Sequence, residues 1–217
     1  MAAFGAAFAT SVSAAQDHSS AGPADARWQP ARHSNDDWFD QLPGVHRFFI
    51  DSVSADGFGE ALLFANNYFS ANKNSYGLEE RSLAVIVCAR HQSTAFAFTD
   101  AMWAKYGAGL AERARFTDPQ TGKPPIVNVY QATGYGTAIR GNGVTLTSVL
   151  GRGMHLAVCQ LATRAAAATI ARQTGAKPDD VYQELASNLV PNAHIVPAGI
   201  IAVNRAQERG YSFAYAG

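Results

Sequence analysis

Hydrophobic and polar positions along the chain follow two alternating periods from Val45 onward. Short β-rich or apolar runs predict strands, and between them apolar residues recur at the spacing of an amphipathic helix. The predicted strands cover 46–53, 82–89, 154–159, 193–199 and 211–216. The predicted helices cover 56–75, 95–107, 144–153, 160–175, 179–190 and 200–210. Ser93 or Thr94 is the expected cap of the helix 95–107, and Gly107 its expected end.

The run "SLAVIVCA" at 82–89 shows how these strands are buried. It is an unbroken apolar stretch of strand length, which is typical of a strand covered on both faces of a parallel sheet. Strands that alternate with helices of this length imply such a sheet, with helices on both sides. The pattern therefore predicts an α/β fold for residues 45–217.

Between the second and third predicted strands lies a long segment with little periodicity. Residues 117–143 are predicted to form a loop, with a short strand at 126–130. Four glycines fall within 134–143, but their order is neither that of a dinucleotide-binding loop nor that of a P-loop. No cofactor is predicted from this segment.

The first 44 residues lack the regular pattern. Residues 1–15 contain a short apolar run followed by small residues that suit signal-peptidase cleavage before Gln16, which favours export to a periplasmic or secreted location. The first basic residue is Arg27, so the usual positive start is missing, and the alternative is a retained arm on a cytoplasmic protein. Residues 16–44 predict a linker or wrapping arm.

Four apolar residues interrupt this polar arm: Trp28, Trp38, Phe39 and Leu42. Aromatic side chains in a polar segment indicate that it lies against a protein surface. That surface belongs either to a neighbouring subunit or to the domain of the same chain.

The composition and the motifs of the chain argue against several classes of function. The chain has 17 basic and 17 acidic residues and only 16% charged residues, so it lacks the electrostatic signature of nucleic-acid or anionic-lipid binding. No stretch reaches the roughly 18 apolar residues that span a bilayer. Two cysteines and six scattered histidines show no metal-ligand spacing, so no metal site is predicted. A GxSxG elbow is absent, which leaves serine hydrolase chemistry without support.

Cys159 is the main candidate for chemistry, because it stands where a predicted strand becomes a helix. Functional groups of open α/β sheets gather at the carboxyl ends of strands, and a helix N-terminus stabilises a thiolate. Thr163 and Arg164, near the first turn of that helix, are counted with the binding residues. The alternative for Cys159 is a small buried core residue, which is the expectation for Cys88.

A second candidate, Arg90 with His91, follows the strand at 82–89 directly. The pair stands where an anion-binding or acid–base pair would emerge from the sheet, although a surface arginine and a loop histidine fit equally well. His155 is too far back along its strand to reach Cys159, and we expect His46 and His194 to be structural.

The stretches "VTLTSVLGRGMHLAVCQLATR" (144–164) and "IVPAGIIAVNRAQERGYSFAYAG" (195–217) together resemble the DsrE/DsrF-like family of sulfur-relay proteins. The matching elements are Gly153, Cys159, Val196-Pro197, Gly199, Gln207-Glu208 and Gly210-Tyr211. The resemblance implies a flavodoxin-like three-layer sandwich with a mostly parallel sheet of about five strands. It also implies homo-oligomers such as trimers or hexamers, and persulfide or thiol transfer between partner proteins through Cys159. The N-terminal extension and the segment 108–143 are additions to the family pattern, as in an exported variant.

Three functions follow from these features. The first is sulfur relay, with Cys159 as persulfide carrier activated by Arg164 and its helix, Arg90 and His91 shaping the pocket, and a donor or acceptor protein as partner. The second is a non-catalytic homo-oligomeric assembly or small-ligand-binding protein of the exported compartment. The third, a redox protein using Cys88 with Cys159, is disfavoured because the two lie on different strands. Whether the protein is an enzyme is left open.

Overall fold

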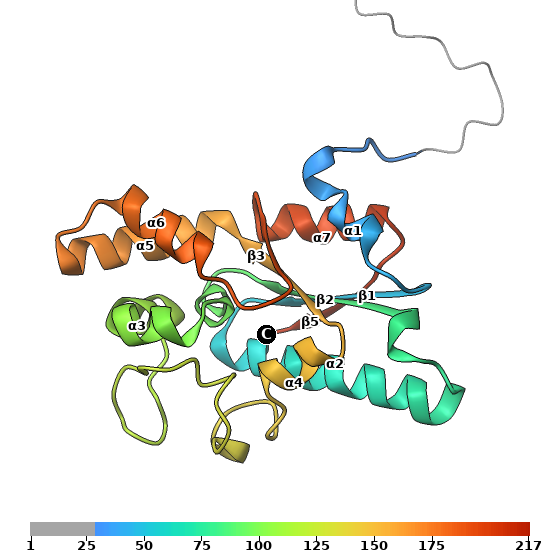
Figure 1. The fold of residues 1–217 in the computed structure, drawn as a ribbon, viewed down its shortest axis with the longest axis horizontal. Helices are drawn as coiled ribbons and strands as arrows, with labels where there is room; N and C mark the ends of the chain where they lie inside the picture. The colour runs from blue at the N-terminus through green and yellow to red at the C-terminus, as the bar shows by residue number, and fades with distance from the viewer. Residues whose placement is uncertain (1–28) are drawn as a thin grey trace, which may run out of the picture. The chain divides into compact units, whose positions relative to one another are not determined.

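Five parallel strands form one sheet at the centre of the fold (Figure 1). A computed structural model describes residues 29–217, and Arg32–Gly217 form one compact unit. The strands are β1 (His46–Ser52), β2 (Leu83–Ala89), β3 (His155–Cys159), β4 (Ala193–Val196) and β5 (Ser212–Ala216). Their order in the sheet is β4-β3-β2-β1-β5. The chain therefore steps from β1 to β4 in one direction and then returns to place β5 on the other side of β1.

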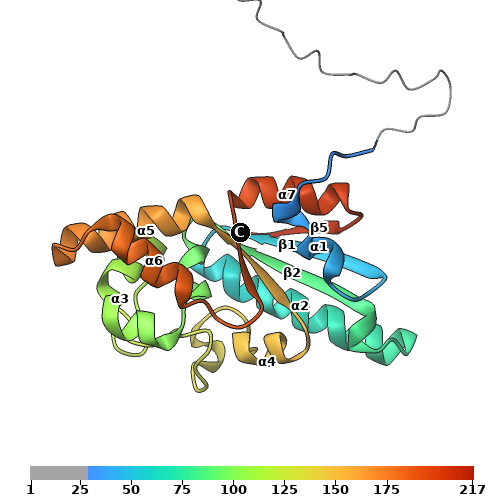
Figure 2. The same cartoon turned by 45° about the horizontal axis from the view of Figure 1, so that its top comes forward.

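Helices cover both faces of the sheet. They are α1 (Trp38–Gln41), α2 (Ala55–Tyr76), α3 (Asp100–Ala114), α4 (Leu146–Gly151), α5 (Gln160–Thr174), α6 (Pro178–Ser187) and α7 (Gly199–Glu208). Short 3₁₀ turns occur at Ser34–Asp36, Glu80–Ser82, Ser93–Ala97 and Gly136–Ala138. Figures 1 and 2 show α1 and α7 on one side of the sheet and α2 and α4 on the other. The predicted α/β fold, a flavodoxin-like three-layer sandwich, is confirmed.

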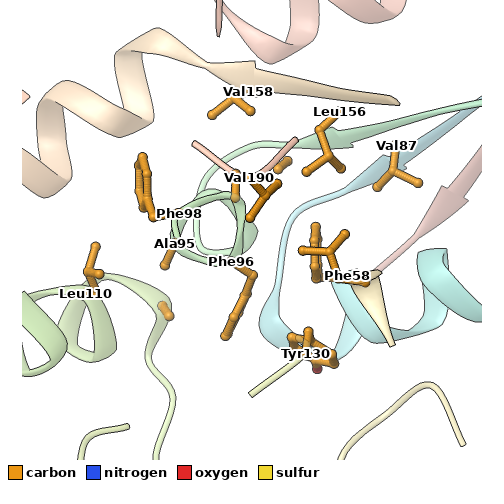
Figure 3. Close-up of a cluster of buried hydrophobic side chains, with 14 of the residues drawn as sticks. Phe58, Val87, Ala95, Phe96, Phe98, Leu110, Tyr130, Leu156, Val158 and Val190 are labelled. Atoms are coloured by element: carbon orange, nitrogen blue, oxygen red, sulfur yellow. The ribbon is translucent and has the colours of Figure 1, made fainter. Parts of the chain in front are cut away.

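Strand β2 shows why the sheet is central, since all seven of its residues are buried. Successive side chains point to opposite faces. Buried hydrophobic residues form two clusters, one on each face of the sheet. Val85 and Val87 belong to the larger cluster, which also contains residues of α2 to α6. Ile86 and Cys88 belong to the smaller cluster, which lies under α1 and α7. Figure 3 shows part of the larger cluster, where Val87 and Leu156 of the sheet lie above aromatic side chains.

The predicted start of the helix 95–107 is wrong, and so is its predicted cap. The chain forms a 3₁₀ turn at Ser93–Ala97 and begins α3 only at Asp100, and neither Ser93 nor Thr94 provides a cap. The break occurs because Phe98 bridges to Leu189 and its carbonyl oxygen accepts a hydrogen bond from the buried Asn128 side chain. These partners are distant in the sequence, so no local signal marks the break.

The sequence predicts that this helix ends at Gly107, and the structure has a kink at the preceding residue, Tyr106, whose φ of −124° and ψ of 18° are not helical. A second helical segment of α3 continues past Gly107. A side chain at this position would overlap the carbonyl oxygen of Pro125, so glycine permits a close approach of the loop to the helix. The helix ends at Ala114, and the residue that follows it, Arg115, has a left-handed φ of 49°. The strand predicted at 126–130 is wrong as well: these residues are irregular, and Asn128 uses its side chain to hold Phe96 and Phe98.

Part of the predicted arm lies on its own chain. Phe39 and Leu42 are buried in the smaller cluster, and the Tyr211 hydroxyl donates a hydrogen bond of 2.7 Å to the Phe39 carbonyl. Trp38 packs against the same cluster. The predicted export segment 1–15, the arm residues 16–28 and Trp28 lie outside the described residues. Within 29–217, no helix is long and apolar enough to cross a membrane.

Candidate functional site

The candidate site is a cavity of about 240 Å³ at the carboxyl ends of β2, β3 and β4. Arg90 and His91 line it from the end of β2, and Cys159 from the end of β3. The amino ends of α5 and α7 complete its walls. This is the edge where open α/β sheets place their functional groups. The structure thus brings together three of the residues that the sequence singles out.

Cys159 is both the last residue of β3 and the N-cap of α5. Its side chain is only 7% exposed, yet it lines the cavity. No side chain caps the first turn of α5. The backbone N–H groups of this turn therefore lack a side-chain acceptor and carry partial positive charge at the wall of the cavity.

Arg90 is committed to an ion pair with Asp51 of β1. Its Nε and Nη2 atoms donate hydrogen bonds of 2.8 and 2.7 Å to the two carboxylate oxygens, and Asp51 is 2% exposed. The hydrogen bond to Asp51 raises the pKa of Arg90 above its usual value. Because the carboxylate neutralises this guanidinium, Arg90 shapes the wall of the cavity and adds little free charge. Asp51 was not singled out from the sequence, although a lone acid in the apolar run "HRFFIDSV" was a usable signal.

Gly199 explains the close fit of α7 over this ion pair. A Cβ atom at this position would lie 2.6 Å from Cβ of Arg90 and 3.1 Å from Sγ of Cys88. Only glycine allows the first turn of α7 to approach so closely. The glycine of "VPAG" therefore has a packing reason in this chain.

Arg113 supplies the free positive charge of the cavity. It reaches the cavity from α3, its Nε is buried without a hydrogen-bond partner, and no acidic side chain of residues 29–217 pairs with it. His91, exposed and with a left-handed φ of 56°, lines the same cavity. The sequence did not point to Arg113, because the predicted helix ended six residues before it.

The other two predicted binding residues do not line the cavity. The Thr163 hydroxyl is buried and donates a 3.0 Å hydrogen bond to the Cys159 carbonyl, so it braces the turn behind the thiol. The Arg164 guanidinium lies over the Tyr182 ring at 4.0 Å and within 3.4 Å of Asp179. Arg164 therefore faces α6 and does not contribute charge to the cavity.

Cys88 lies deeper, fully buried on β2, on the same face of the sheet as Cys159. Burial, followed by the charge of Asp51, raises the pKa of its thiol well above the ordinary value. Both cysteines are free thiols. Cys88 therefore behaves as a small core residue. Among the described residues, no three histidine, cysteine or acidic side chains gather as metal ligands would.

Fold and site together define the class: an α/β protein with a thiol cavity at the carboxyl edge of a parallel sheet. Comparisons with models of known families, with curated proteins and with solved structures give no match. The function must therefore be argued from the cavity.

Proposed function

We propose that the protein is a sulfur carrier of the DsrE/DsrF-like kind, with Cys159 as the atom that receives and passes on sulfane sulfur. One observation carries the proposal. The Cys159 thiol lines a cavity that also holds the unpaired Arg113 guanidinium and the uncapped start of α5. A persulfide donor is an anion, so this positive surrounding favours its binding next to the thiol.

The transfer step is a thiolate attack on a persulfide donor. Sγ of Cys159 attacks the outer sulfur of the donor R–S–S⁻, a new S–S bond forms, and the donor's own S–S bond breaks. The electron pair of the broken bond leaves on R–S⁻. We assign His91, exposed on the same wall, to protonate this leaving thiolate.

The donor or acceptor is a partner protein. Leu161 and Ile200, at the starts of α5 and α7, line the same cavity and are 63% and 62% exposed. Exposed aliphatic side chains beside a reactive group are suited to contact with a docking protein. The oligomeric state and the exported location also remain predictions, since neither follows from the cavity.

Mass spectrometry of the intact protein tests the proposal. After exposure to glutathione persulfide, the wild-type chain should gain the mass of one sulfur atom, and Cys159→Ser should gain none. Cys88→Ser is the matched control and should still be labelled. Arg113→Gln should slow the labelling about tenfold, which corresponds to a loss of about 1.4 kcal/mol of transition-state stabilisation. An unlabelled wild-type chain, or equal labelling of Cys159→Ser, contradicts the proposal.

The unpaired charge of Arg113 also favours a second candidate, a non-catalytic protein that binds a small anion in the same cavity. Titration calorimetry with thiosulfate separates the two. A binding protein should retain the anion in Cys159→Ser and lose it in Arg113→Gln, without any change of mass.

A further inference from the structure

Strand β5 forms an open edge of the sheet. It pairs with β1 on one side, and no strand of residues 29–217 pairs with its other side. Its sequence, "SFAYA" at 212–216, contains no charged residue and no proline. Charge, proline and bulges are the means by which natural edge strands avoid pairing with other chains. The composition of β5 is therefore that of a strand that pairs.

Two aromatic side chains of β5 lie on one face of the sheet. The register places Phe213 beside Phe49 and Tyr215 beside Asp51, and Phe49 belongs to the cluster on the α1 and α7 side. Both aromatic residues are about half exposed: Phe213 is 42% and Tyr215 55% exposed. The strand thus presents the order aromatic, alanine, aromatic.

We propose that β5 pairs antiparallel with β5 of a second copy of the chain, about a two-fold axis at Ala214. In this register Phe213 lies opposite Tyr215 of the second copy, and the relation holds twice because the axis exchanges the copies. Directly opposed aromatic residues are favourable cross-strand pairs. The second copy is the occupant because the strand is complementary to itself, and two-fold interfaces of this kind are the most common in soluble oligomers.

The size of the contact sets its strength. An aromatic side chain buries roughly 150–250 Å². With about half of each ring exposed, the four aromatics of a pair bury roughly 400 Å² in total, against about 1,000 Å² for a stable interface. The backbone hydrogen bonds between the two strands also contribute to the free energy of association, but the dimer should still dissociate on dilution. A two-fold contact also gives an even number of copies, so it does not by itself build a trimer.

Analytical ultracentrifugation of the full chain tests the pairing, and charge reversal tests its register. We expect the weight-average mass to rise toward that of a dimer between about 1 µM and 500 µM, the range of a micromolar to sub-millimolar Kd. Phe213→Lys/Tyr215→Lys places lysine opposite lysine twice and should remain monomeric. Phe213→Glu/Tyr215→Lys places glutamate opposite lysine twice and should dimerise. An equimolar mixture of the Lys/Lys variant with Phe213→Glu/Tyr215→Glu should form dimers that neither forms alone.

Ile126→Lys is the control, since Ile126 is 73% exposed on a loop outside β5 and its replacement should leave the dimer unchanged. Far-UV circular dichroism verifies that each variant is folded, and all the changed side chains are exposed. A wild-type chain that stays monomeric overturns the proposal. So does a Lys/Lys variant that dimerises like the wild type, or a Glu/Lys variant that is as dissociated as the Lys/Lys variant.

Discussion

The pair His155 and His194 should make the stability of the fold fall in mild acid. Nδ1 of His155 lies 3.1 Å from Nε2 of His194, and Trp38 of α1 stacks on the His194 ring at 4.1 Å. Burial, followed by the charge of His194, lowers the pKa of His155 to about 4, and burial also lowers the pKa of His194. The two neutral histidines thus connect β3, β4 and α1.

The sign of the effect follows from these pKa values. In the unfolded chain a histidine has a pKa of about 6.5, so the unfolded state takes up a proton before the folded state does. The contribution of the pair is complete above pH 6.5 and is lost as the pH falls toward 4. For each proton that the unfolded state binds and the folded state does not, the free energy of unfolding falls by up to about 1.4 kcal/mol per pH unit in this window. Between pH 6.5 and 4.5 the full shift of the His155 pKa corresponds to a loss of about 2 kcal/mol, and screening at the partly open ring reduces the expected loss to about 1–1.5 kcal/mol.

Urea unfolding at several pH values measures this loss. Asp118, Glu184 and Glu208 also have lowered pKa values, so their contribution to stability is lost mainly below pH 4.5. His155→Phe keeps an aromatic ring but cannot titrate, so the loss between pH 6.5 and 4.5 should shrink by about 1–1.5 kcal/mol, the part assigned to His155. The part that comes from His194, whose pKa is lowered by its own burial, should remain. His46→Phe, at an exposed position at the start of β1, is the matched control. The same pH dependence in His155→Phe and in the wild type would refute the reasoning.

Two further stability predictions concern the site and its support. Arg90→Ala should cost about 3–5 kcal/mol in urea unfolding, because it leaves the Asp51 carboxylate buried and unpaired, and Arg90→Met/Asp51→Leu should recover much of the loss. A cost below about 1 kcal/mol would show that water reaches Asp51. Gly107→Ala should cost about 1–3 kcal/mol in thermal unfolding because its methyl group would overlap the Pro125 carbonyl oxygen. Gly151→Ala, with no atom within 4 Å of the new methyl group, should be neutral or stabilising, and equal effects of the two changes would count against the overlap.

The site was partly readable from the sequence. Arg90, His91 and Cys159 could be grouped in advance because parallel strands bring their carboxyl ends to one edge of the sheet, so that residues just after neighbouring strands meet. Arg113 could not be grouped with them. It comes from a helix whose course past Gly107 depends on a loop that packs against it.

Local sequence determined the elements of this protein, and tertiary structure decided their partners. Strands such as β2 are visible in the sequence because burial on both faces requires an unbroken apolar run, and helices because one apolar face repeats every turn. The break after Ala97, the contact between His155 and His194, and the edge position of β5 leave no such trace. Each depends on which distant segment lies alongside, and strand order is set by the path of the whole chain through the crossovers and not by the residues of any one strand.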